Sequence, residues 1–262
     1  MDTRLHWPEY LGEAALLGAF MLVACAAGVL LDHPAAAAVR AIPDPFARRV
    51  LFGVAMGATA IAIIYSPIGK RSGAHINPSV TLAFLRLGKV KPRDAAFYVV
   101  AQLAGATAGV LIAWAALGAR LADPAVHFVT TRPGASGLLV AFVAEAAISF
   151  VLMAVVLAVS GSRRAAWTGV CAGTLVVLYI TFEAPLSGMS MNPARSLGSA
   201  IVAGELQALW IYLVAPPLGM LAAAAAMQRR AARACAKLHH APDVPCIFCG
   251  QGMSSASPRR AA

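Results

Sequence analysis

The sequence has little charge. Charged residues make up 12% of its 262 positions and hydrophobic residues 60%, and the mean hydropathy is +0.75. Soluble globular domains carry roughly 25% charged residues, so an ordinary soluble domain is excluded. Acidic residues are the scarcer kind, 11 against 21 basic ones, for a net charge of +10. The basic residues lie in short loops and a tail beside apolar runs, which indicates a membrane protein and argues against a nucleic acid partner.

Cysteines and catalytic patterns are also few. Cys25 and Cys171 lie in apolar runs, and the other three of the five cysteines lie near the C-terminus, so the pattern excludes a secreted disulfide framework. The apolar runs contain no Ser/His/Asp or His-Glu-x-x-His arrangement. We therefore expect neither an enzyme nor a bound cofactor.

Long apolar runs are what the chain has instead. A helix needs about 20 apolar residues to cross a bilayer, and six runs have that length. They are Tyr10–Leu31, Val50–Ile68, Ala95–Leu117, Leu138–Ser160, Ala166–Phe182 and Leu206–Met227. The sequence thus predicts six transmembrane helices.

Two Asn-Pro pairs interrupt this pattern, Asn77-Pro78 and Asn192-Pro193. Asn is a preferred helix N-cap and Pro suits the first helical position, so a helix is expected to begin at each proline. Each of these helices soon ends at a glycine, too early to cross a bilayer. Two interrupted segments at matching positions of two halves point to a transport pathway near the membrane midplane.

The order of elements predicts the fold. Each half contains three spans and one half-helix, so the halves must enter the membrane from opposite sides. We expect an all-α membrane protein with a channel domain over 1–228, inverted repeats over about 10–117 and 138–227, and a basic, disordered tail over 229–262. Most Lys and Arg residues fall on one side of the spans, which predicts an inner or plasma membrane protein with both termini in the cytoplasm.

The two interrupted segments resemble the signature loops of the aquaporin, or major intrinsic protein, family. They read SGAHINPSVT (72–81) and NPARS (192–196), and the resemblance extends over about 10–227. The first departs from the usual Asn-Pro-Ala by carrying Ser79, where the second has Ala194. The resemblance implies a homotetrameric, passive channel in the lipid bilayer for water and small neutral solutes such as glycerol, urea or neutral metalloid acids, with protons and ions excluded.

The half-helix termini suggest how ions would be excluded. Each Asn oxygen is used in capping, while its NH₂ group faces a passing water, and the two positive dipole ends oppose cations. The resemblance implies that Arg195 lines a narrow filter, and ungapped offsets place Ile180, Met189 and Gly57 beside it. Water channels of the family usually have a His and an aromatic at the positions of Ile180 and Gly57. This filter is therefore expected to be wide and apolar.

Two observations leave alternatives open. Gly57 also completes a Gly53-xxx-Gly57 pattern typical of close helix packing, and a shift of one residue would replace it with Met56. Ser196 follows the filter Arg as in the family's water channels, whereas its glycerol facilitators have Asp there. We expect water as a cargo, with small neutral solutes as an addition.

Glu13 and Glu145 are carboxylates within apolar runs, where a charge is expensive unless it is hydrogen-bonded. One interpretation makes them the coupling groups of a proton-coupled secondary transporter. We favour the other, that they accept hydrogen bonds from the re-entrant loops, because they occur symmetrically in both halves. Gln102 is expected to support a loop in the same way. A third possibility, a structural protein with a closed pore, would show no water flux.

The tail contains a His pair, His239 and His240, and a Cys-x-x-Cys pattern, Cys246 and Cys249. These residue types bind soft metals or form redox pairs. Their spacing does not match an ordinary zinc finger, and an isolated Cys-x-x-Cys is weak evidence. The sequence favours a reduced tail without a metal, whose basic residues are attracted to anionic lipid.

Overall fold

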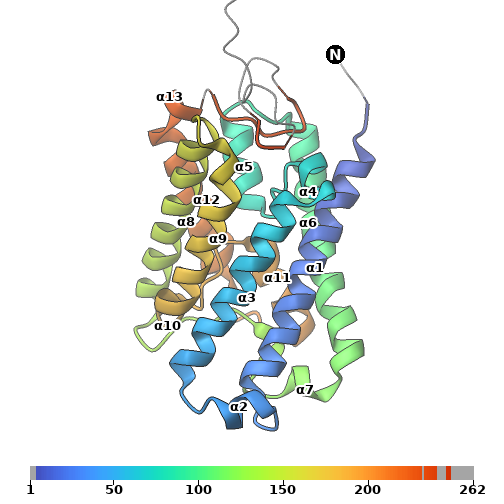
Figure 1. The fold of residues 1–262 in the computed structure, drawn as a ribbon, viewed down its shortest axis with the longest axis vertical. Coiled ribbons are helices and arrows are strands. Elements are labelled where there is room, and N and C mark those ends of the chain that lie inside the picture. Colours follow the sequence, from blue (N-terminus) through green and yellow to red (C-terminus); the bar gives the residue numbers. More distant parts are fainter. Residues whose placement is uncertain (1–3, 232, 241–245, 249–262) are drawn as a thin grey trace, which may run out of the picture.

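The computed structural model describes residues 4–231, 233–240 and 246–248. In this part of the chain six helical stretches are long and apolar enough to cross a membrane, and they form one bundle (Figure 1). They are Trp7–Asp32 (α1), Pro45–Tyr65 (α3), Pro92–Leu117 (α6), Leu138–Ser160 (α8), Ala165–Ser187 (η2, α9, η3 and α10) and Leu209–Ala226 (α12). The predicted all-α membrane architecture with six spans is confirmed.

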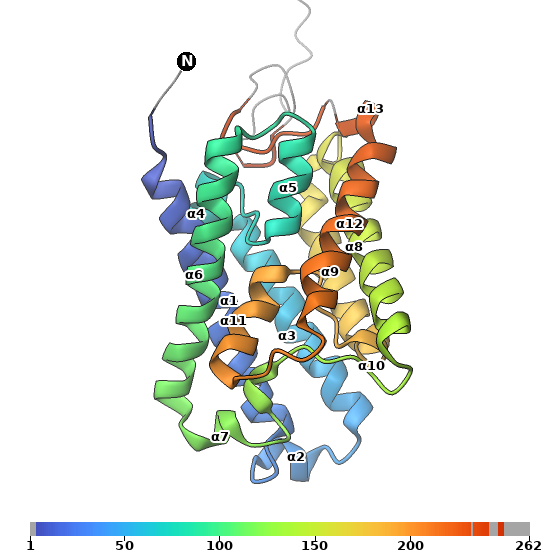
Figure 2. The same ribbon diagram turned by 180° about the vertical axis from the view of Figure 1, so that it is seen from behind.

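Two short helices account for the interrupted segments. α5 covers Pro78–Arg86 and α11 covers Pro193–Ala203. Figure 2 shows that they enter the bundle from opposite ends and that their first turns approach each other near its middle. Their lengths of 9 and 11 residues are too short to cross a bilayer.

The two halves of the chain repeat one order of elements. α1, α3, α5 and α6 in the first half correspond to α8, α9, α11 and α12 in the second. The fifth span consists of Ala165–Trp167 (η2), Thr168–Leu178 (α9), Tyr179–Glu183 (η3) and Ala184–Ser187 (α10). The remaining short helices are Ala37–Ala41 (α2), Pro67–Ser72 (α4), Ala119–Ala122 (α7), His127–Val129 (η1) and Gln228–Ala231 (α13).

The start of the second span differs from the sequence-based prediction. It begins at Pro45 rather than Val50, because Asp44 accepts hydrogen bonds from two backbone N–H groups of the first turn, at 3.0 and 3.3 Å. After Tyr65 the chain turns and forms the separate helix α4. Counting residues back from the first Asn-Pro pair therefore does not predict which positions of α3 face the inside of the bundle.

Small residues let helices of the first half approach closely. A Cβ atom on Gly105 would lie 2.1 Å from the carbonyl oxygen of Ala14, and one on Gly109 would lie 2.4 Å from that of Gly18. α1 and α6 thus touch backbone to backbone, as small-xxx-small patterns in membrane helices allow.

The N-terminal end of α1 and the tail lie at one end of the bundle, here called the tail end, and α2 and α7 mark the opposite loop end (Figure 1). Residues 233–240 and 246–248 cover the tail end, and Ala234, Ala236 and Cys246 among them are buried. This part of the tail packs against the bundle, because its alanines and cysteines provide small apolar contacts.

Candidate functional site

Asn77 and Asn192 cap the two half-helices as predicted. Asn77 Oδ1 accepts the backbone N–H of Ser79 at 2.8 Å, and Asn192 Oδ1 accepts those of Ala194 at 3.1 Å and Arg195 at 3.3 Å. Pro78 and Pro193, which have no N–H to satisfy, occupy the first helical positions. The positive ends of both helix dipoles therefore lie at these two asparagines.

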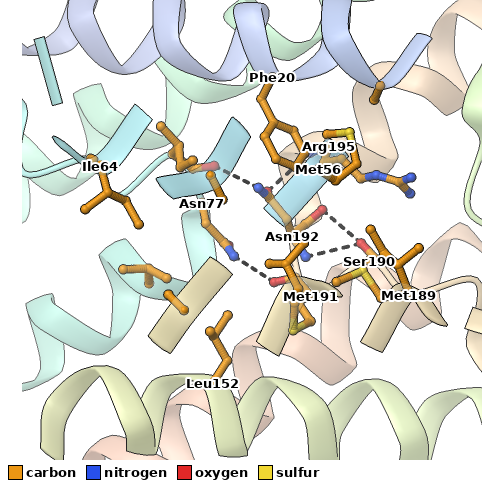
Figure 3. Close-up of a pocket in the computed structure, with 18 of the residues that line it drawn as sticks. Phe20, Met56, Ile64, Asn77, Leu152, Met189, Ser190, Met191, Asn192 and Arg195 are labelled. Carbon is orange, nitrogen blue, oxygen red and sulfur yellow. Dashed lines mark hydrogen bonds between the residues drawn. The ribbon is translucent and has the colours of Figure 1, made fainter. Parts of the chain in front are cut away.

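The two side-chain amides also join the loops to each other (Figure 3). Asn77 Nδ2 donates to the carbonyl oxygen of Met191, and Asn192 Nδ2 donates to that of Ile76, both at 2.7 Å. A carboxamide nitrogen carries two hydrogens, so each amide retains a second donor after this bond.

Glu13 holds the first loop from behind. It accepts hydrogen bonds from Ser72 Oγ at 2.7 Å and from the backbone N–H groups of His75 at 3.0 Å and Ile76 at 2.5 Å. Gln102 Nε2 donates to the same carboxylate at 2.8 Å. All these contacts are inside the bundle, where Glu13 has no exposed surface.

Glu145 repeats this arrangement in the second half. It accepts hydrogen bonds from Ser187 Oγ at 2.9 Å and from the backbone N–H groups of Ser190 at 2.5 Å and Met191 at 2.8 Å. The carboxylates thus satisfy backbone donors that the re-entrant loops leave without a helical partner.

Sequence reasoning missed four residues of this repeated support. Ser72 and Ser187 each donate to a glutamate, while Tyr98 and Tyr212 donate from their hydroxyls to the carbonyl oxygens of those two serines, at 2.7 and 2.6 Å. The signal was present as a Ser-Gly pair before each signature loop and a Tyr at a similar distance after it.

The supported loops have an unusual backbone. Ala74 and Ile76 in the first loop have φ of 46° and 41°, and Met189 and Met191 in the second have φ of 50° and 53°. Positive φ is unfavourable for side chains other than Gly, above all for a β-branched residue such as Ile76. Such conformations persist where surrounding contacts over-determine them, and the buried glutamates provide those contacts.

A cavity of about 500 Å³ runs along the bundle past the capped termini. Its wall extends from Asp32 and Pro45 at the loop end, past Asn77 and Asn192, to Cys235 at the tail end. Most of the wall is apolar. Glu13, Glu145 and Gln102 are buried behind the loops and do not belong to the described wall.

Three of the four expected filter residues lie in the cavity wall: Ile180, Met189 and Arg195. Arg195 Nη1 donates a hydrogen bond to Thr131 Oγ1, and Thr131 Oγ1 lies 2.8 Å from Ser196 Oγ. Thr131 belongs to the long loop between the halves, a contact that the sequence did not predict. The guanidinium is thereby fixed in the wall on the loop-end side of the asparagines.

Gly57 does not line the cavity, so its expected place in the filter is wrong. A Cβ atom there would lie 2.4 Å from Val177 Cγ2 and 2.6 Å from the carbonyl oxygen of Gly173, which puts Gly57 in the contact between α3 and α9. Phe52 and Met56 are the residues of this part of α3 that face the cavity. The physical reason is the turn after α3. Because of this turn, a position counted without gaps from the first signature loop does not fall on the cavity side of α3.

The tail candidates for metal binding lie in different surroundings. His239 Nε2 lies 2.8 Å from a carboxylate oxygen of Asp94, so His239 holds the tail to α6. His240 and Cys246 lie close together beside the tail-end mouth of the cavity. Cys249 lies outside the described residues.

In the part of the chain that the structure describes, six membrane-length helical stretches, two opposed half-helices and a central cavity define a multi-pass membrane protein built from an inverted repeat. The chain belongs to the major intrinsic protein family, since the family model of that name matches residues 4–227. The resemblance of the two Asn-Pro loops to the family's signature segments is therefore confirmed.

Similar proteins carry related names. Aquaporin NIP1-4 of Oryza sativa subsp. japonica is 41% identical over 177 residues, which are 65% of this chain and 61% of that protein. Probable aquaporin NIP7-1 of Arabidopsis thaliana is 34% identical over 210 residues, 79% of this chain and 72% of that one. The match thus spans about three fifths of the length of the rice relative. The solved aquaglyceroporin of Plasmodium falciparum has the same fold, with a TM-score of 0.72, 19% identity and coverage of 86% and 96%.

Proposed function

We propose that the chain is a passive transmembrane channel for water and small neutral solutes. One observation carries this proposal: Asn77 and Asn192 cap two half-helices whose first turns meet across a cavity that runs along the bundle. Each amide has a second hydrogen available for the oxygen of a passing molecule. The names of the relatives, which are aquaporins, support the same function.

Protons and ions are excluded by the same arrangement. Two positive dipole ends and the Arg195 guanidinium raise the energy of any cation in the middle of the cavity. An anion would have to lose its hydration beside an apolar wall, which is expensive. Neutral molecules meet neither barrier.

We place the filter at Arg195, Ile180 and Met189, together with Phe52 and Met56, which line the same cavity. Its wall is apolar apart from the guanidinium, so a solute forms few hydrogen bonds there. Because Gly57 does not line the cavity, it does not widen the filter. Met56 and Met189 do line it, and their unbranched side chains can adapt to a passing solute. We infer that water passes together with small neutral solutes such as glycerol, urea or a neutral metalloid acid.

Orientation and assembly follow from the charges and the family. Lys70, Arg71 and the described basic residues of the tail lie at the tail end. We therefore place the chain in a cell or plasma membrane, with that end and both termini on the cytoplasmic side. We place the channel domain in residues 1–228 and a cytoplasmic, basic tail that contains Cys and His in residues 229–262. The assembly is a homotetramer with one pore in each chain.

The rival function, a proton-coupled transporter, uses Glu13 or Glu145. Both carboxylates are fully buried behind the loops and accept loop N–H groups. A coupling group has to exchange protons with a cavity, and neither carboxylate belongs to the cavity wall. The passive channel is the better account.

Stopped-flow light scattering of reconstituted vesicles tests the proposal. Wild-type vesicles are expected to respond to an osmotic step several times faster than empty vesicles. Arg195→Val removes the filter cation and is expected to raise glycerol and urea permeability while water flux persists. Arg120→Val is the matched control, since Arg120 is an exposed arginine on α7 at the same end of the bundle. Water flux equal to that of empty vesicles would refute the channel.

A further inference from the structure

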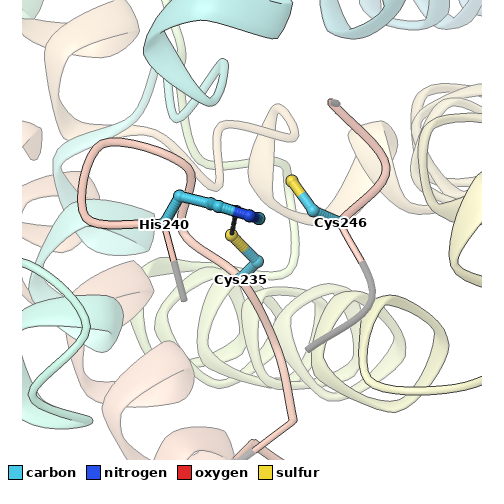
Figure 4. A group of neighbouring side chains, drawn as sticks. All are labelled: Cys235, His240 and Cys246. Carbon is cyan, nitrogen blue, oxygen red and sulfur yellow. Dashed lines mark hydrogen bonds between the residues drawn. The ribbon is translucent and has the colours of Figure 1, made fainter. Parts of the chain in front are cut away.

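Three potential metal ligands meet at the tail-end mouth of the cavity. Cys235, His240 and Cys246 each offer one ligand atom, and the three atoms all lie within 4.8 Å of one another (Figure 4). Cys235 Sγ lies 3.3 Å from His240 Nδ1. Cys235 and Cys246 are buried and His240 is half-buried.

These separations suit a tetrahedral ion. Zinc binds thiolate sulfur at about 2.3 Å and imidazole nitrogen at about 2.0–2.1 Å, so tetrahedral ligand atoms lie roughly 3.5–3.8 Å apart. The observed range, from 3.3 Å to no more than 4.8 Å, contains that spacing. Small side-chain rotations would bring the three atoms onto one ion.

The segment that carries the ligands is fixed to the bundle independently of them. Asp94 of α6 holds His239, the neighbour of His240, at 2.8 Å and also binds His6 Nδ1 at 2.9 Å. The chain next to Cys235 lies directly on the first re-entrant loop, because a Cβ atom on Gly73 would be 2.7 Å from the carbonyl oxygen of Ala236. Supported, buried ligands and one half-exposed imidazole are features of a site that an ion can enter and occupy.

We propose that Cys235, His240 and Cys246 form a binding site for one thiophilic d¹⁰ cation, represented by Zn²⁺. Two sulfur ligands and one imidazole match the soft-ligand preference of such ions, whereas Mg²⁺ and Ca²⁺ prefer oxygen. Binding converts two thiols to thiolates and releases their protons to solvent. The fourth position is open to water.

The site is placed to act on the cavity. Cys235, Ala236, Ile247 and Phe248 belong to the same cavity wall as Asn77. An ion that joins Cys235 to Cys246 holds the tail segments 233–240 and 246–248 together across the tail-end mouth of the cavity. Zn²⁺ therefore narrows the tail-end exit, a consequence that rests on the proposed channel function, whereas the binding itself does not.

Binding is measured on the untagged full-length protein in detergent, with thiols kept reduced. Competition between the protein and a chromophoric chelator for Zn²⁺ gives affinity and stoichiometry. We expect one ion per chain, and affinity weaker by at least about tenfold in Cys235→Ser/Cys246→Ser and in His240→Ala. Cys171→Ser is the matched control, since Cys171 lies in α9 and outside the cluster. Equal affinity in all four proteins, or no binding to the wild type, overturns the site.

Osmotic flux in vesicles with Zn²⁺ on both sides tests the consequence. Zn²⁺ is expected to reduce wild-type water flux toward that of empty vesicles and to leave Cys235→Ser/Cys246→Ser unaffected. A bound ion with unchanged flux overturns the narrowing. Absence of water flux in every protein, with or without Zn²⁺, refutes the channel and the narrowing together, while the chelator competition still decides the metal site. Unchanged melting temperatures show that the variants remain folded.

Discussion

Asn77 and Asn192 each donate a hydrogen bond to the carbonyl group that immediately precedes the other, both at 2.7 Å. Asn77 reaches Met191 and Asn192 reaches Ile76, so the exchange is reciprocal. Each asparagine therefore caps its own half-helix and fixes the opposite loop. The dipole ends, the loops and the remaining amide hydrogens are held as one unit in the middle of the cavity.

Asn192→Asp is expected to admit protons. The aspartate keeps an acceptor for the N–H groups of Ala194 and Arg195, but it loses the donor to Ile76 and adds a negative charge. A unit charge about 4 Å from a cation lowers its energy by about 4 kcal/mol at an effective dielectric constant of 20, enough for well over tenfold faster leak. A pH-sensitive dye trapped in vesicles measures it. Gln207→Glu adds the same charge at an exposed site and is the control; equal leak in both variants would contradict the dipole barrier.

Gly57→Ala and Met56→Ala separate packing from filtering. The new Cβ on residue 57 would press on Val177 and Gly173, and such overpacking costs about 1–3 kcal/mol. The glycerol-to-water permeability ratio of Gly57→Ala is expected to stay at the wild-type value. Met56→Ala removes a side chain from the cavity wall and is expected to raise that ratio several times. Melting temperatures and stopped-flow traces of both variants give the comparison, and a reversed pattern would return Gly57 to the filter.

Glu145→Gln is expected to reduce stability rather than abolish coupling. The Glu145 carboxylate accepts hydrogen bonds from the backbone N–H groups of Ser190 and Met191, whereas a glutamine would place an NH₂ group against one of them. A buried donor left unsatisfied in this way costs about 1–3 kcal/mol. Glu205→Gln breaks partly exposed pairs with Arg132 and His127 and should change stability by less than about 1 kcal/mol. Solute uptake with and without a pH gradient supplies the functional readout. Accumulation that depends on the gradient in the wild type and is lost in Glu145→Gln would support the transporter instead.

Ser79→Ala is expected to be nearly neutral. Ser79 Oγ is buried and has no hydrogen-bond partner among the described residues, so its removal leaves no other group unsatisfied and should change stability by less than about 1 kcal/mol. Thr81→Val is the matched contrast, because Thr81 Oγ1 donates to the carbonyl oxygen of Asn77 and accepts from Gln102. Thermal unfolding in detergent compares them. A large loss in Ser79→Ala would show that the hydroxyl has a structural role.

Much of the fold was predictable because it follows from local chemistry. Hydrophobic run length identifies the six spans, and the preference of Asn and Pro for the first positions of a helix identifies both half-helices. The contacts of Glu13 and Glu145 were also predictable, since a buried carboxylate needs donors and an irregular loop has spare N–H groups.

Other features depend on geometry that residue counting does not contain. The side of α3 that faces the cavity is set by the turn between α3 and α4. Gly57 was therefore misplaced, its alternative Met56 lies in the cavity wall, and Phe52 was missed. The anchoring of Arg195 by Thr131 joins residues 64 positions apart in the sequence. The packing of the tail against Gly73 likewise joins distant segments, and composition alone suggested disorder.

The crossed amide bonds have a consequence for biosynthesis. A ribosome delivers Asn77 and its loop to the membrane long before Met191 has been translated, so the first half cannot complete its own centre. Until α11 and α12 arrive, that loop relies on contacts within the first half, among them those of Glu13 and Gln102. Docking of the two halves is thus the step that first brings the capped ends of α5 and α11 together.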